Sequence, residues 1–232
     1  MKALAAINLI LFVICVPLLL ITTNLRFAVN DIRLYEYGVN KYQVSEDTGL
    51  DKGNLTEIAH KLTTYFNSDE EFVDVSVYNQ RDIQHLKDVK GLIQLAYRLQ
   101  FVSLAYIALY IGFNFLLLRG AFWRQLARRL TWGSLTTIAI LAVLGIIALV
   151  DFDQFFLLFH LVSFRNDLWQ LYPGDKLLAM FPEGFFNDAA LFVGGAIVLE
   201  AIIIGGLAWG YLRLRSKSGT EPVPRRSNSS GS

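Results

Sequence analysis

Four long apolar runs restrict what this sequence can fold into. They cover about residues 4–23, 99–118, 135–150 with flanking residues, and 189–212. A helix of roughly 20 apolar residues crosses a hydrocarbon layer of about 30 Å. Hydrophobic residues make up 54% of the chain and charged residues 18%, which is too apolar for an ordinary soluble domain. We therefore expect an all-α membrane protein with four transmembrane helices.

The distribution of basic residues predicts how these helices cross the membrane. Basic residues gather in two places: Arg119, Arg124, Arg128 and Arg129 between the second and third runs, and Arg213, Arg215, Lys217, Arg225 and Arg226 after the fourth. Cytoplasmic loops carry an excess of Lys and Arg, so both termini are expected inside. The first run has no small-x-small cleavage site and is expected to remain as an uncleaved anchor.

The chain is expected to divide at the ends of these runs. We expect transmembrane helices at 1–23, 97–118, 133–151 and 189–212, an extracytoplasmic cap at 24–96, a cytoplasmic loop at 119–132, an outer interfacial or re-entrant segment at 152–188, and a disordered tail at 213–232. Residues 72–78 alternate and predict a short strand within an otherwise helical cap. Asn79, with Asp82 three residues later, predicts the start of one long helix that continues through the second span.

Two of the three histidines are candidates for chemistry. His85 precedes Asp88 by three residues, so both share a helical face, and a carboxylate there can fix the tautomer of an imidazole. The alternative is a solvated charged helix with an incidental histidine. His160 follows the third run among aromatic residues, and its alternative is a hydrogen-bonded interfacial histidine. His60 is interpreted as a surface residue.

The sequence contains no recognised covalent machinery. It has no Gly-x-Ser-x-Gly motif, its single cysteine, Cys15, lies in the first run, and Ser163 is only a local neighbour of His160. The net charge of +1 gives no field that would attract nucleic acid. We expect no nucleic-acid partner.

Two further hypotheses concern metals and the membrane interior. A metal site from His85, His160 and Asp153 or Asp175 lacks any recognised ligand spacing, so no metal and no cofactor are expected. Glu200 lies near the middle of the fourth run, where an ionisable group is costly. It predicts either a proton or substrate path or a helix-packing hydrogen bond, with Asn114 as a plausible partner.

Two blocks of sequence carry a family resemblance. The first is RDIQHLKDVK at 81–90; the second is LFHLVSFRNDLW at 158–169, followed by DKLLAMFPEGFF at 175–186. With the anchor, the outer cap and the spans in this order, the chain resembles the lipoprotein intramolecular transacylase (Lit) family of bacterial integral membrane proteins. The resemblance extends from the first span to about Leu212.

The resemblance implies an acyltransferase of the bacterial cytoplasmic membrane. Its substrates would be diacylated lipoproteins among membrane lipids, with the active site facing the outer leaflet. The enzyme would move the sn-2 acyl chain of the S-diacylglyceryl group to the α-amine of the N-terminal cysteine, giving an N-acyl lyso-lipoprotein. The resemblance implies His85 and His160 as the catalytic pair. We expect Asp88, Asn166, Asp167, Trp169 and Asp175 in supporting positions.

The residues fit this chemistry. An α-amine has a pKa of about 8, so a nearby neutral imidazole can deprotonate it, and no enzyme nucleophile is required when both groups belong to one molecule. We expect His160 as the base, kept neutral by its aromatic surroundings, and His85, held or charged by Asp88, as the donor. Competing hypotheses are a histidine-ligated metal or haem membrane protein, a lipid- or protein-binding scaffold, and an acyl hydrolase that uses water.

Overall fold

The structure, a computed structural model, describes residues 2–118 and 121–217. These residues form nine α-helices and no strand: α1 (Lys2–Asn30), α2 (Ile32–Lys41), α3 (Val44–Thr48), α4 (Lys52–Phe66), α5 (Gln80–Leu118), α6 (Phe122–Val150), α7 (Phe152–Ser163), α8 (Lys176–Met180) and α9 (Glu183–Lys217). Four of the nine are long and apolar enough to cross a membrane. The expected all-α membrane architecture is confirmed.

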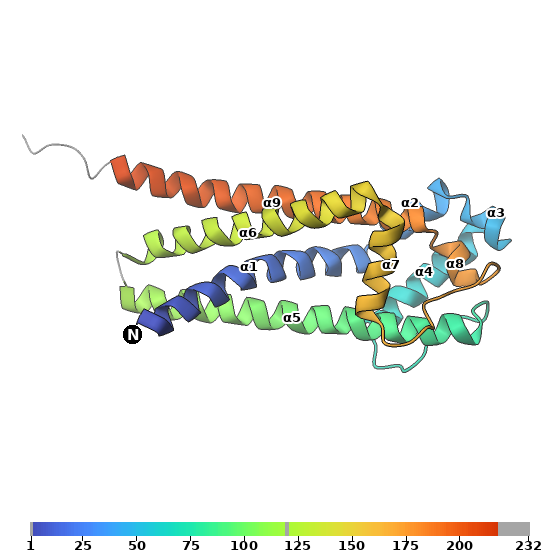
Figure 1. The fold of residues 1–232 in the computed structure, drawn as a ribbon. Helices are drawn as coiled ribbons and strands as arrows, with labels where there is room; N and C mark the ends of the chain where they lie inside the picture. Colours follow the sequence, from blue (N-terminus) through green and yellow to red (C-terminus); the bar gives the residue numbers. More distant parts are fainter. Residues whose placement is uncertain (1, 119–120, 218–232) are drawn as a thin grey trace, which may run out of the picture.

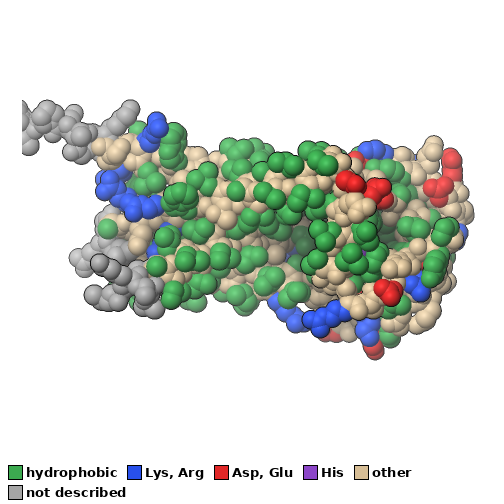
Figure 2. All heavy atoms as spheres, in the orientation of Figure 1, with side chains coloured by type: hydrophobic (Ala, Val, Ile, Leu, Met, Phe, Trp, Pro, Cys, Tyr) green, Lys and Arg blue, Asp and Glu red, His purple; other side chains and the backbone are tan. Residues whose placement is uncertain are grey.

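The four long helices α1, α5, α6 and α9 run alongside one another as a bundle (Figure 1). α1 packs against α5 and α6, and α6 packs against α9. Glycines allow the close approaches: a Cβ added to Gly133 would lie 2.7 Å from Val16, and one added to Gly205 would lie 2.8 Å from Ser134. Figure 2 shows hydrophobic side chains along the middle of the bundle and charged side chains gathered near its two ends.

Helix α5 is longer than a bilayer requires. Its 39 residues extend roughly 58 Å at 1.5 Å per residue, so one half rises out of the spanning region. The first half carries the charged residues, and Asn79 caps it as predicted: its Oδ1 accepts hydrogen bonds from the N–H groups of Arg81 and Asp82, while Asp82 accepts from the N–H of Asn79. His85 therefore lies beyond the spanning part of α5.

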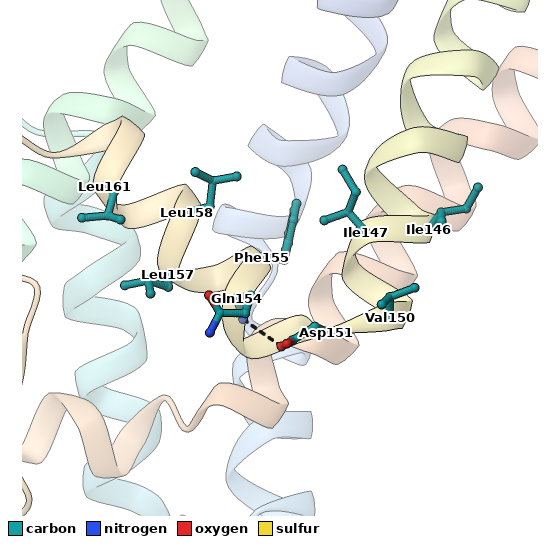
Figure 3. A pocket seen from close by; sticks show the side chains of 9 residues that line it. All are labelled: Ile146, Ile147, Val150, Asp151, Gln154, Phe155, Leu157, Leu158 and Leu161. Carbon is teal, nitrogen blue, oxygen red and sulfur yellow. Dashed lines mark hydrogen bonds between the residues drawn. The ribbon is translucent and has the colours of Figure 1, made fainter.

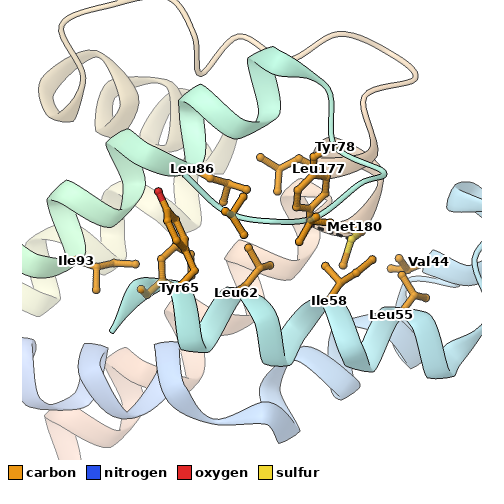
Figure 4. Packing of buried hydrophobic residues seen from close by; sticks show 13 residues of the cluster. Val44, Leu55, Ile58, Leu62, Tyr65, Tyr78, Leu86, Ile93, Leu177 and Met180 are labelled. Atoms are coloured by element: carbon orange, nitrogen blue, oxygen red, sulfur yellow. Dashed lines mark hydrogen bonds between the residues drawn. The ribbon is translucent and has the colours of Figure 1, made fainter. Parts of the chain in front are cut away.

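The cap consists of α2, α3, α4, α8 and the first half of α5. Its core gathers apolar side chains from all these parts except α2, and Figure 4 shows them interleaved: Val44, Leu55, Ile58, Leu62, Tyr65, Phe66, Val73, Val75, Tyr78, Leu86, Ile93, Leu177 and Met180. Leu177 and Met180 belong to α8. The two expected outer segments therefore share one hydrophobic core.

The predicted strand at residues 72–78 is wrong. Val73, Val75 and Tyr78 are buried in the cap core, and the N–H of Tyr78 donates to the carbonyl of Val75 in a turn. The alternation of apolar and polar residues reflects which side chains are buried and does not indicate a strand. A strand also needs a neighbouring strand to accept its backbone hydrogen bonds, and none lies within the described residues.

The predicted partner of Glu200 is also wrong. The carboxylate of Glu200 accepts a hydrogen bond of 2.7 Å from Nδ2 of Asn24, which joins α9 to α1. Asn114 donates instead to the carbonyl of Tyr110, within its own helix. Glu200 therefore takes part in a hydrogen bond between packed helices, the second of the two alternatives considered.

Helix boundaries refine the expected divisions. α6 already begins at Phe122, so most of the segment 119–132 is helical, and α9 begins at Glu183 and ends at Lys217. The expected disordered tail falls mostly on residues 218–232, outside the described part of the chain.

Candidate active site

Helix α7 carries His160 across one end of the bundle. Its N-cap is Asp151, whose side chain accepts a hydrogen bond from the N–H of Gln154. With 12 residues it extends about 18 Å, too short to span a bilayer. In Figure 1 it runs from the end of α6 toward α5. The short helix therefore brings His160 to the face of α5 that carries His85.

The two histidine rings meet at this junction. Their centroids lie 6.2 Å apart with an interplanar angle of 33°. Phe164 contacts both rings, at 5.2 Å from His85 and 5.7 Å from His160. His85 is 8% exposed and His160 is 7% exposed. Side chains from two distant parts of the sequence thus form one pair, which is largely buried. Their catalytic role stays a prediction.

Aromatic rings enclose His160 on several sides. Phe156 lies at 4.4 Å, Trp169 at 5.0 Å and Phe159 at 5.3 Å between ring centroids. Its Nδ1 lies 2.7 Å from the carbonyl oxygen of Phe156. A carbonyl oxygen only accepts hydrogen bonds, so Nδ1 carries the proton and Nε2 keeps its lone pair. The local helix therefore leaves Nε2 as the basic nitrogen.

Burial keeps both imidazoles neutral. Desolvation lowers the pKa of His160, and the hydrogen bond to the carbonyl of Phe156 opposes part of that change. Desolvation lowers the pKa of His85 to about 4; the ring of His160 acts in the same direction, and the charge of Asp88 opposes it. Near pH 7 the site therefore holds two uncharged rings.

Asp88 does not take the position expected for it. Its Oδ2 accepts a hydrogen bond of 2.9 Å from Nδ2 of Asn166, while Nδ1 of His85 is buried with no hydrogen-bond partner among the described residues. Three residues along a helix bring side chains to one face, but the amide of Asn166 binds the carboxylate instead. The structure thus does not support a His85 that is held or charged by Asp88.

The other expected supporting residues shape the segment after α7. The backbone carbonyl of Asp167 accepts from Nη1 of Arg81 at 2.9 Å. The carboxylate of Asp175 accepts from Nδ2 of Asn79 at 2.6 Å and from the N–H of Tyr172 at 2.7 Å. Asn166 and Trp169 contact Asp88 and His160, respectively. Asp167 therefore takes part through its backbone carbonyl, and the carboxylate of Asp175 holds the end of this segment.

Residues for the alternative chemistries are not brought together. In the described ranges, no three His, Cys, Asp or Glu side chains are arranged to hold a metal ion. His60 is exposed on α4 in the cap. Asp153 lies in the first turn of α7, two turns from His160. The histidine pair, by contrast, brings together two titratable rings that fit acid–base chemistry.

Comparisons with known proteins decide the family. The family model described as "Lipoprotein intramolecular transacylase Lit" matches residues 10–186, which is most of the chain. The chain belongs to the Lit family. As a member of the Lit family it is an acyltransferase that acts on lipoproteins.

One relative and several solved structures are also similar to this chain. An uncharacterized protein of Aquifex aeolicus (strain VF5) is 26% identical over 212 residues, covering 84% of this chain and 93% of its own. The solved Lit structure from Bacillus cereus has a TM-score of 0.80 at 19% identity, covering 94% of this chain and 100% of its own. A Bacillus cereus variant with an H85R mutation has a TM-score of 0.75 at 18% identity, covering 94% and 96%. These structures share the fold of this chain.

An apolar pocket lies where α6 joins α7. It has a volume of about 470 Å³ and is lined by Ile146, Ile147, Val150, Asp151, Gln154, Phe155, Leu157, Leu158 and Leu161. Figure 3 shows these side chains projecting from the end of α6 and from α7. Residues four apart on a helix share a face. Gln154 and Leu158 lie on the face of α7 that lines the pocket, whereas Phe156 and His160 lie on a different face. The pocket thus lies on a face of α7 other than the one that carries His160.

Two residues that shape the candidate site, Phe156 and Arg81, were not predicted from the sequence. Phe156 lies four residues before His160 on α7, so helical spacing gave a signal for its contact with the ring. Arg81 binds carbonyl groups of a segment more than 80 residues later, and no local pattern indicates such a contact.

The protonation state of the pair is testable by nitrogen NMR. The chain contains three histidines, so [15N]histidine labelling gives the signals of three imidazole rings. The signals of His60 are assigned with a His60→Ala variant. We expect His85 and His160 to be predominantly neutral at pH 6.5, with the proton of His160 on Nδ1. A ring of this pair that is half protonated at or above pH 6.5 contradicts the burial argument.

Proposed function

We propose that this chain moves the sn-2 acyl chain of a diacylated lipoprotein from the glyceryl oxygen to the α-amine of the N-terminal cysteine. The observation that carries the proposal is the contact of two buried, neutral imidazoles in a member of the Lit family. Ester and amine belong to one molecule, so holding both at this pair replaces a covalent enzyme intermediate.

In this proposal His160 is the general base. Its Nδ1 proton is engaged by the carbonyl of Phe156, so Nε2 can accept a proton from the α-amine. The amine nitrogen attacks the ester carbonyl and a C–N bond forms. The tetrahedral intermediate then collapses, the bond to the glyceryl oxygen breaks, and His160 returns its proton to that oxygen. No water is consumed, and the product is an N-acyl lyso-lipoprotein.

His85 is proposed as a neutral hydrogen-bond donor. Its Nδ1 is buried without a partner, so Nε2 is the nitrogen that can meet a substrate. With the proton on Nε2, the ring donates to the carbonyl oxygen as negative charge develops there. Donors aimed at such an oxygen typically contribute 10²–10³-fold to rate. A low pKa suits this role, because the ring keeps its charge state while the oxyanion forms.

We also propose that the cap and the histidine pair face the outside of a bacterial cytoplasmic membrane, with both termini inside. In support, the described basic residues at the opposite end of the bundle include Arg124, Arg128, Arg213 and Arg215 (Figure 2). The exposed apolar side chains of Leu158 and Leu161 on α7 support a position of this helix among lipid tails near the outer surface. The acyl chains of the substrate would approach from that side.

The proposal is tested by mass spectrometry of one reporter lipoprotein. The reporter is made in a bacterial host with no other N-acylating enzyme, with and without this gene. The expected N-terminal peptide keeps its total mass while one acyl chain changes from an ester to an amide. A free amine with one acyl chain lost to water indicates a hydrolase and contradicts the proposal.

A further inference from the structure

The segment that follows α7 crosses the face of α5 that carries His85. We call residues 164–175 the strap; they connect α7 to α8 and contain no helix (Figure 1). The strap carries Phe164, which contacts both histidines, and Trp169, which contacts His160. The position of the strap therefore determines the surroundings of the pair.

Three side chains from the start of α5 hold the strap. Asn79 donates to Asp175 at one end, and Asp88 accepts from Asn166 near the other. Arg81 binds the middle: Nη1 donates to the carbonyl of Asp167 at 2.9 Å and to that of Gln170 at 3.2 Å. Arg81, His85 and Asp88 are spaced four and three residues apart, so one helical face carries both anchors and the histidine.

The two carbonyls that Arg81 binds lie on either side of Trp169. Its guanidinium also lies over the ring of Tyr172, 4.8 Å from the centroid. In the turn between these two carbonyls, the N–H of Gln170 donates to the carbonyl of Asp167. The N–H of Leu171 donates to the carbonyl of Trp169. A guanidinium, with five donors in a rigid plane, suits this combination of carbonyls and a ring better than an ammonium does. We call these contacts of Arg81 with the strap the clamp. With the clamp in place, the indole of Trp169 lies against the imidazole of His160, and the two ring planes are inclined by 33°.

We propose that Arg81 is a positioning residue for acyl transfer, holding the turn of the strap so that Trp169 packs on His160. The inference deepens the proposed function and rests on it. Without the clamp the indole moves, water reaches the imidazole, and Nε2 no longer keeps a fixed direction. A misplacement of about 1 Å can reduce a rate by roughly 10²-fold, so the clamp affects catalysis without touching the substrate.

The test compares Arg81→Gln and Arg81→Lys with Arg165→Gln. Arg165 lies in the same strap, is exposed, and has no hydrogen bond, ion pair or ring contact within the described residues, so its substitution is a matched control. Steady-state kinetics use a synthetic diacylated lipopeptide with the full-length protein in detergent. [15N]histidine NMR follows the titration of the His160 imidazole in the same samples. The titratable group in contact with that ring is the neutral His85 on α5, and Asp88 acts on His85.

Arg81→Gln is expected to lower kcat about tenfold or more, with a smaller change in KM. Its His160 midpoint should move upward, because water that reaches the ring stabilises the imidazolium. Arg81→Lys should lie between Arg81→Gln and the wild type, and Arg165→Gln should match the wild type in both measurements. The proposal is overturned if Arg81→Gln matches Arg165→Gln, or if only one of the two readouts changes. A wild-type protein that makes no amide product defeats the proposed function separately, because the NMR comparison does not depend on turnover.

Discussion

Alanine at His160 is expected to reduce amide formation by about 10²-fold or more. A positioned general base typically contributes 10²–10⁴-fold, and His160 presents a nitrogen whose lone pair is kept free by the hydrogen bond at Nδ1. Glutamine at this position is expected to be equally inactive, because an amide neither accepts nor returns a proton near pH 7. The rate is measured with purified protein and a synthetic diacylated lipopeptide, with ester and amide products separated by mass spectrometry.

The matched control is His60→Ala, which removes an exposed imidazole from α4 in the cap. We expect His60→Ala to keep the wild-type rate, and we expect all three variants to accumulate in membranes. Activity of His160→Ala within a few fold of the wild type would remove the general base from the mechanism.

His85 is expected to respond differently to the two substitutions. His85→Ala removes the donor to the oxyanion and should reduce the rate by about 10²–10³-fold, the usual effect of losing one such donor. His85→Gln retains an N–H donor of similar reach, so it should recover a measurable part of that loss. The contrast with His160→Gln separates donation from proton transfer at two rings that contact each other.

The measurement is again the initial rate of amide formation, at a fixed pH near 7. Lys87→Gln is a suitable control, because Lys87 lies on the same helix and pairs with Glu71 in the cap. Equal losses for His85→Ala and His85→Gln, with His160→Gln retaining activity, would reverse the two roles.

The helices were predictable because their signals are local. Apolar runs of spanning length gave the four bundle helices, and Asn79 with Asp82 gave the start of α5 to the residue. The strand at 72–78 failed because alternation reports which side chains are buried, and here Val73 and Val75 face the cap core from an irregular segment. Helix packing also lay beyond local patterns: Asn24, 176 residues from Glu200, becomes its partner through the contact of α1 with α9.

At the site, too, features with a local signal were predictable and features that depend on the assembled fold were not. The sequence indicated both histidines and the aromatic surroundings of His160, because titratable and aromatic residues near a membrane boundary stand out. It did not indicate that Asp88 binds Asn166 rather than His85, since that choice depends on the path of the strap. The low pKa of His85 likewise follows from burial by α7 and the strap, which only the assembled fold provides.

The most direct measurement is a double-variant comparison of His85→Ala, His160→Ala and the protein that carries both, with enough enzyme to detect each residual rate. Groups that act on one reacting centre lose their effects together rather than independently. If both rings act on the same lipidated cysteine, the rate loss of the double variant should be much smaller than the product of the two single losses. Losses that multiply would show that the two rings act independently, and would contradict a shared site.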